Sequence, residues 1–163
     1  RDQAGRSVTL VRESGLPYRP APDERILLAG KDRDFLRIGD EFFPGADSYR
    51  IEFPLFDYAS DRDRNRFRAA LAEYDTVIFC LSDPNSLEVL QEAAETDVRV
   101  IVLSILTPIY LLETPWVQSA VAVYGWGEES FRAGFSVILG AMEAEGRLPI
   151  SLDHPAAMPG GQR

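Results

Sequence analysis

The sequence predicts an α/β fold, namely a three-layer α/β/α sandwich around a mostly parallel, flavodoxin- or Rossmann-like sheet. Short apolar runs alternate with helical patterns, as expected for parallel strands that are covered on both faces. Each apolar run opens directly into a polar or glycine-containing turn, where an open α/β sheet places its ligand crevice. The clearest runs are residues 76–81, 98–103 and 120–124. One antiparallel edge strand is also expected near a terminus.

The amino-terminal half carries further strand signals. Expected strands cover the β-branched run 7–12, the apolar run 25–30 and the alternating run 49–53. Residues 13–24 are rich in glycine and proline and predict a surface connection. The polar stretch 31–48, which also contains glycine and proline, is expected to be irregular.

Two helix starts carry a capping signal. Ser60 and Asp63 resemble a capping box, with Asp in place of the usual Glu or Gln. Asp83 is followed by Pro84, which suits an N-cap and a first helical position because proline needs no amide partner there. A helix is therefore expected to begin directly after each signal.

Two further helices are expected in the carboxyl-terminal half. Thr107 and Pro108 repeat the cap-and-proline pattern and predict a short helix through residue 112. The last helix has an apolar stripe formed by Phe131, Phe135, Ile138, Leu139 and Met142. Gly146 is expected to end that helix. Residues 1–152 are thus expected to form one domain, followed by a tail at 153–163.

Composition limits the classes of function. The 163 residues are 45% hydrophobic and 26% charged, which suits one globular domain with a single core. A net charge of −9 argues against nucleic-acid binding. No apolar run reaches the roughly 18 residues of a membrane span. A single cysteine excludes an internal disulfide and most zinc frameworks, and we expect neither a metal nor a cofactor. The compartment stays open.

The residue types used in catalysis occur in unfavourable settings. Cys80 lies inside an apolar strand, where core packing is the favoured interpretation. Asp153 and His154 could transfer a proton, but they lie in the expected tail, so a surface role is favoured. Asp83 follows a strand as a phosphoacceptor would, yet no acidic pair accompanies it to bind magnesium, and helix capping is the simpler explanation.

Loop residues after the strands are candidates for a cleft or an interface. Residues 125–129 follow a strand but form neither a GxGxxG nor a Walker pattern. Neighbouring carboxylates in the sequence do not establish the separation that a glycosidase requires. We predict no catalytic residue, and the candidates for a substrate cleft or a domain interface are Asp83, Thr107, Tyr110, Trp126 and Glu128.

Several segments occur in an order and at a spacing that are typical of a known domain. They are residues 7–12 with Leu16-Pro17, 75–78, 100–104, 107–112, 123–125 and the closing run 146–150, Gly-Arg-Leu-Pro-Ile. In this order they resemble the C-terminal α/β sandwich domain of glycoside hydrolase family 3, especially its β-N-acetylhexosaminidase branch. The resemblance covers residues 5–152.

The resemblance implies a larger bacterial enzyme and a partner domain. A catalytic (β/α)₈ barrel would precede this domain in the same polypeptide and carry the Asp nucleophile and an Asp–His acid/base. Neither is carried over to this chain, and Asp153-His154 does not correspond to that pair. The parent would act on a carbohydrate substrate, hydrolysing terminal β-N-acetylhexosaminides by a retaining mechanism without a metal. This domain would pack against the barrel, and its isolated surface should then expose an apolar patch.

Two other functions remain open. The alternative hypothesis is a stand-alone doubly wound module that binds a small molecule or a protein in the crevice at its strand ends. The third hypothesis is an independent hydrolase that uses loop carboxylates, although no nucleophile–base set supports this function.

Overall fold

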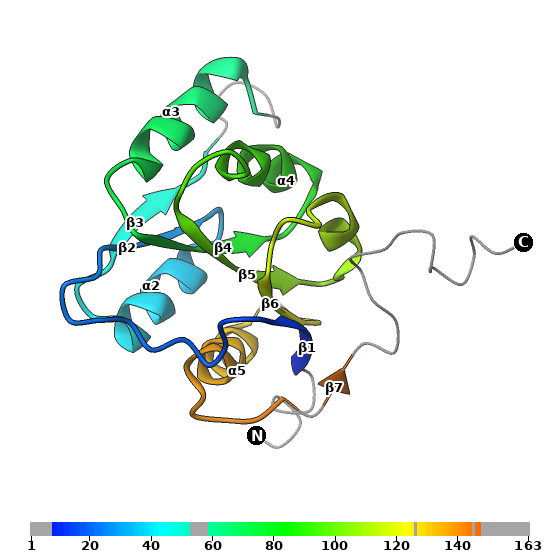
Figure 1. Cartoon of the computed structure of the whole chain (residues 1–163). Helices are drawn as coiled ribbons and strands as arrows, with labels where there is room; N and C mark the ends of the chain where they lie inside the picture. The colour runs from blue at the N-terminus through cyan, green and yellow to red at the C-terminus, as the bar shows by residue number, and fades with distance from the viewer. Residues whose placement is uncertain (1–7, 53–58, 126, 145, 148–163) are drawn as a thin grey trace, which may run out of the picture.

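A seven-stranded sheet lies between two layers of helices in the computed structural model, which describes residues 8–52, 59–125, 127–144 and 146–147 (Figure 1). The strands are β1 (Val8–Glu13), β2 (Ile26–Gly30), β3 (Asp47–Arg50), β4 (Thr76–Leu81), β5 (Arg99–Ile105), β6 (Ser119–Val123) and β7 (Gly146–Arg147). The helices are α2 (Arg33–Phe42), α3 (Asp61–Leu71), α4 (Pro84–Leu90) and α5 (Glu128–Leu139), with 3₁₀ turns η1 (Gln91–Ala93) and η2 (Ile109–Glu113). The predicted three-layer sandwich is confirmed.

The strand order of the sheet is β3-β2-β4-β5-β6-β1-β7. The strands β2 to β6 run parallel, and their relative order, 2-1-3-4-5, is that of flavodoxin-like folds. The predicted antiparallel strand is β1, which pairs with β6 so that Val8 lies opposite Val123 and Glu13 opposite Ser119. The two-residue strand β7 pairs with β1 in parallel and forms the edge beyond it.

Each face of the sheet has its own aromatic core. On the face covered by α2 and α5, the rings of Phe35 and Phe135 stack with their centroids 5.2 Å apart. On the face covered by α3 and α4, Phe67 meets Phe79 edge-on at 5.7 Å. All six residues of β4 are buried, which explains its uninterrupted apolar sequence. Burial raises the pKa of the Cys80 thiol, as expected for a core side chain.

The helix caps predicted at Ser60 and Asp83 are present. The hydroxyl of Ser60 accepts a hydrogen bond from the Asp63 amide at 3.1 Å, and the Asp63 carboxylate accepts one from the Ser60 amide at 3.0 Å. Asp83 caps α4 by accepting from the Ser86 amide at 2.7 Å, and Pro84 takes the first helical position.

The prediction that residues 31–48 are irregular is wrong, because they contain α2 and the beginning of β3. Asp32 caps α2 and accepts from the Asp34 amide at 2.8 Å. Gly39 lies inside the helix, where an added Cβ would come within 2.9 Å of the Phe135 ring. This glycine allows α2 to approach α5 closely, and it does not mark a loop.

The last helix ends earlier than predicted. Gly140, with φ +86°, forms the left-handed cap of α5, whereas Gly146 lies in β7. The short helix expected through residue 112 is the 3₁₀ turn η2, and its predicted start is wrong by one residue: Pro108 takes the N-cap position without a side-chain cap hydrogen bond, and Ile109 is the first residue of the turn. The tail predicted at 153–163 lies outside the described residues.

Candidate functional site

The carboxyl end of the sheet, where the parallel strands finish, carries an ion pair at its topological switch point. Lys31 follows β2, Asp83 follows β4, and the Lys31 Nζ donates to the Asp83 Oδ2 at 2.7 Å. The two side chains are 28% and 32% exposed. Burial alone would raise the pKa of Asp83, but the hydrogen bonds from Lys31 and the Ser86 amide outweigh it and lower that pKa. Asp83 is therefore held as a carboxylate.

Three apolar side chains lie at the same end of the sheet, after the next two strands. Leu106 follows β5, Ile109 begins η2, and Tyr124 follows β6; they are 45%, 45% and 46% exposed. The Leu106 amide donates to the Val123 carbonyl at 2.9 Å, so the two strand ends are joined. Among the described residues, these are the large hydrophobic side chains with the greatest exposure, and we call them the carboxyl-end patch.

The backbone holds Leu106 in an unusual conformation. Its φ is +74°, and the Thr107 amide donates across it to the Ile105 carbonyl at 2.8 Å, which closes a γ-turn. The left-handed region costs a non-glycine residue roughly 1–2 kcal/mol. The buried Ser104 hydroxyl supports the turn by donating to the Thr107 carbonyl at 2.8 Å. Such strain is typical of functional positions, and here it presents an apolar side chain to solvent.

The chain enters the domain beside this patch. Because β1 is antiparallel to β6, its first residue, Val8, pairs with Val123 at the carboxyl end of the sheet. The Tyr124 hydroxyl donates to the Thr9 hydroxyl at 3.2 Å, which joins the patch to the start of β1. The first residues of β1 therefore lie next to the carboxyl-end patch.

The other predicted site residues lie in separate environments. Thr107 belongs to the turn beside the patch, and its hydroxyl accepts from the Ile109 amide at 3.2 Å. Tyr110 is half-buried against the core on the α3–α4 face. Glu128, in the first turn of α5, accepts from the Arg132 guanidinium at 2.9 Å, and this bond lowers the pKa of Glu128. Trp126 lies outside the described residues, as do Asp153 and His154.

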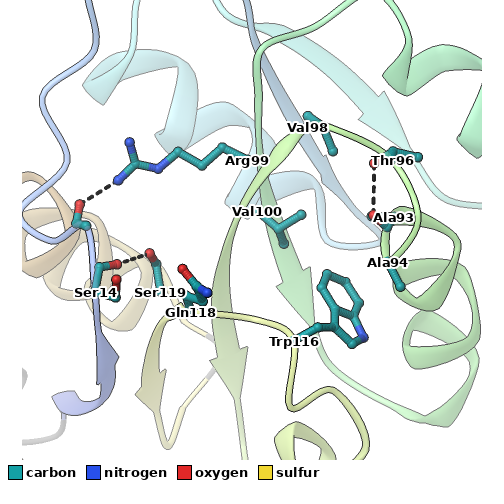
Figure 2. Close-up of a pocket in the computed structure, with 11 residues that line it drawn as sticks. Ser14, Ala93, Ala94, Thr96, Val98, Arg99, Val100, Trp116, Gln118 and Ser119 are labelled. Atoms are coloured by element: carbon teal, nitrogen blue, oxygen red, sulfur yellow. Dashed lines mark hydrogen bonds between the residues drawn. The ribbon is translucent and has the colours of Figure 1, made fainter.

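A cleft of about 310 Å³ opens at the opposite, amino end of the sheet (Figure 2). We call it the amino-end cleft. Its lining includes Ser14, Val98, Val100, Trp116, Gln118 and Ser119. No local pattern in the sequence predicts this cleft, because its residues come from the turn after β1, from the region around η1, and from the starts of β5 and β6.

Arg12 is a buried cation behind the loop that carries Trp116. Its guanidinium, in a residue only 7% exposed, donates to the carbonyl oxygens of Thr114, Val117 and Leu111 at 2.7, 3.0 and 2.9 Å. An arginine in a strand rich in β-branched residues is the one sequence signal of this arrangement, because a buried cation needs hydrogen-bond acceptors around it.

The described residues contain neither a metal-ligand cluster nor a membrane-spanning helix. Within residues 8–52, 59–125, 127–144 and 146–147, no three His, Cys, Asp or Glu side chains are grouped so that they could hold a metal ion. No helix among these residues has the length and apolar character needed to cross a bilayer.

The sequence matches no protein-family profile and no curated protein. Its fold, however, matches solved structures of glycoside hydrolase family 3 enzymes. A fungal multi-domain β-N-acetylglucosaminidase of that family, with a GCN5-related glucosamine N-acetyltransferase region, aligns with a TM-score of 0.74 and 21% identity over 92% of this chain and 18% of its own. A family 3 β-N-acetylglucosaminidase from Paenibacillus sp. str. FPU-7 aligns with a TM-score of 0.69 and 17% identity, over 91% and 31%.

A third match is a β-glucosidase from Listeria innocua in complex with isofagomine. It aligns with a TM-score of 0.62 and 14% identity, over 86% of this chain and 24% of its own. The resemblance inferred from the sequence is thus confirmed at the level of the fold. The chain is folded like a domain of family 3 glycoside hydrolases and spans less than a third of the length of these enzymes.

Proposed function

We propose that this chain is the non-catalytic C-terminal domain of a bacterial family 3 glycoside hydrolase of the β-N-acetylhexosaminidase type. Residues 1–152 form the domain and residues 153–163 its tail. It packs against a catalytic (β/α)₈ barrel that precedes it and supports that barrel, which hydrolyses terminal β-N-acetylhexosaminides. The observation that carries the proposal is the carboxyl-end patch, which lies beside the point where the chain enters.

The size of the patch suits a partner in the same polypeptide. Fully burying a large apolar side chain contributes about 1.5–3 kcal/mol, so covering the exposed halves of three such side chains contributes about 2–4 kcal/mol. That corresponds to a dissociation constant of about a millimolar or weaker. A covalent linker supplies an effective concentration in the millimolar range, so a contact this weak can form within one polypeptide although it would not form between separate chains.

The carboxylates near this end of the sheet are also consistent with a domain that supports the barrel and does not catalyse. Asp83 is paired with Lys31, and Glu128 with Arg132. Both pKa values are lowered, whereas the general acid of a glycosidase needs a raised pKa in order to hold its proton. These groups suit structural ion pairs better than acid catalysis.

The first test is the natural polypeptide. Intact mass and peptide sequencing of the gene product should reveal a barrel of a few hundred residues before Arg1. The whole enzyme should cleave a chromogenic β-N-acetylglucosaminide, and the isolated chain should not. A native polypeptide that begins close to Arg1 would overturn the proposal.

The second test addresses the carboxyl-end patch in the whole enzyme. Replacing Leu106, Ile109 and Tyr124 together by serine should split one calorimetric unfolding transition into two, because the domains lose their contact. The same triple variant of the isolated chain should bind less hydrophobic dye. Gln118→Ser, an exposed position at the other end of the sheet, is the control and should leave the single transition intact. An unsplit transition in the triple variant would contradict the docking surface.

The alternative function is a stand-alone doubly wound binding module. The observation that favours it is the pair of Lys31 and Asp83, which lies where the strand order reverses between β2 and β4. A native start near Arg1 together with binding of a small molecule at this pair would support the alternative.

A further inference from the structure

We propose that the amino-end cleft is a binding site for a neutral sugar ring, with the indole of Trp116 as its apolar wall. This inference goes beyond the proposed function, because it requires neither a barrel nor catalysis. The cleft, at about 310 Å³, has the volume of a small-molecule site and holds about one or two sugar units.

The two sides of the cleft differ in chemistry (Figure 2). The Trp116 indole lies with Val98 and Val100 on one side, where the Thr96 hydroxyl already donates to the Ala93 carbonyl at 2.8 Å. On the other side lie Gln118, Ser14 and Ser119, and the Ser119 hydroxyl donates to the Ser14 carbonyl. A pyranose has the matching pair of surfaces: a face of C–H groups that packs against an aromatic ring and a rim of hydroxyls that exchange hydrogen bonds. The exposed amide of Gln118 can donate and accept, so it can serve a hydroxyl in either role.

The aromatic wall is held in place before a ligand arrives. The Trp116 Nε1 donates to the Gln91 Oε1 at 3.3 Å, which orients the indole. Arg12 holds the backbone on both sides of Trp116 through the Thr114 and Val117 carbonyls. Because this loop is already ordered, little additional conformational entropy is lost when the cleft is filled.

The charges around the cleft favour a neutral ligand. None of the described residues that line it is acidic, so a cation finds no carboxylate there. Arg99, the one cation among the described lining residues, already donates to the Gly15 carbonyl at 2.7 Å, and its guanidinium carbon lies 5.0 Å from the centroid of the Tyr18 ring. An anion would have to displace Arg99 from the Gly15 carbonyl and the Tyr18 ring. The net charge of the chain, −9, would also repel it. A neutral polyol faces neither obstacle.

The test is a titration of the 163-residue chain with N-acetylglucosamine and its β-1,4-linked disaccharide, followed by amide and indole NMR shifts. We expect a dissociation constant of about 1–10 mM, with shifts at the Trp116 indole and the Gln118 side chain. Trp116→Ala should weaken binding at least about tenfold and Gln118→Ala about threefold. Arg37→Ala removes an exposed side chain of α2, an element that contributes no residue to the cleft, and should bind as the unaltered chain does.

Several outcomes would overturn this site. The first is the absence of NMR shifts up to about 50 mM sugar, and the second is a set of shifts centred on Tyr124. The third is a Gln118→Ala variant that binds the sugar as tightly as the unaltered chain does, because this exposed side chain can be removed without disturbing the fold. The result is separable from that for the proposed function. Sugar binding in a protein whose native start is near Arg1 would uphold the cleft and refute the barrel, and a barrel enzyme without these shifts would do the reverse.

Discussion

Replacing Arg12 by methionine is expected to lower the free energy of unfolding by about 2–4 kcal/mol. The Arg12 guanidinium is buried and donates to three carbonyl oxygens of residues 111–117. These carbonyls lie at the end of η2 and in the turn after it, where aligned peptide dipoles leave partial negative charge. Methionine keeps most of the unbranched stem, so the variant removes the donors and the charge with little loss of packing.

The magnitude follows from two opposing contributions. Three hydrogen bonds from a charged donor, at about 1.5–3 kcal/mol each, give about 5–9 kcal/mol. Against this, the variant no longer bears the cost of burying a guanidinium, which is several kcal/mol. The carbonyls of Leu111 and Thr114 also keep hydrogen bonds from the amides of Thr114 and Val117, at 3.1 and 3.0 Å. They are therefore not left unsatisfied, and a net loss of about 2–4 kcal/mol remains.

Equilibrium urea unfolding, followed by far-ultraviolet circular dichroism, measures this loss. The matched control is Arg99→Met, the same substitution at an exposed arginine that donates to one carbonyl, where we expect a loss of about 0.5–1 kcal/mol. If Arg12→Met loses no more than Arg99→Met, the buried guanidinium is not what holds residues 111–117 against β1. Arg12 would then not be the group that holds the Trp116 loop in place before a sugar binds.

Two further substitutions test the turn chemistry and the ion pair at the switch point. Gly140→Ala should cost about 2–4 kcal/mol in urea unfolding, because a Cβ would meet Pro17 at 2.6 Å in addition to the left-handed strain. Gly45 has a similar positive φ, +94° against +86°, but open space around it, so Gly45→Ala should cost only about 1 kcal/mol; equal losses would contradict the Pro17 contact. Lys31→Met should lower stability near neutral pH, because the lowered pKa of Asp83 means that the pair stabilises the fold above the ordinary carboxyl pKa of 3.8. This difference from the unaltered chain should vanish as pH falls through the lowered pKa, and a difference that is constant with pH would exclude the ion pair as its cause.

The parts of the fold that the sequence predicts are those with a local physical cause. A continuous apolar run such as residues 76–81 suits a strand that is buried on both faces, and Asp83-Pro84 has few roles other than starting a helix. The error at residues 31–48 has the opposite origin. Gly39 is a loop signal when it is considered alone, but its actual constraint is the nearby Phe135 ring, almost a hundred residues later in the chain. Local patterns contain no information on such a contact.

The candidate sites were less predictable, because they depend on which segments the topology brings together. Leu106 and Tyr124 are unremarkable in the sequence, and they become a patch only through the pairing of β5 with β6. The amino-end cleft combines the turn after β1 with the starts of β5 and β6. The Arg12 signal was present in the sequence, but its meaning depends on three carbonyls about a hundred residues away.

The antiparallel strand β1 links both proposals. Because it runs against the other strands, its first residue, Val8, lies at the carboxyl end of the sheet beside Tyr124, where an upstream domain would attach. Its last residues lie at the amino end, where Arg12 holds the Trp116 loop and the following turn supplies Ser14 to the cleft. If β1 were parallel, the chain would enter at the end with the cleft, and an upstream domain would compete with the sugar for that space. The direction of this one strand therefore allows a partner domain and a sugar ring to occupy opposite ends of the sheet at the same time.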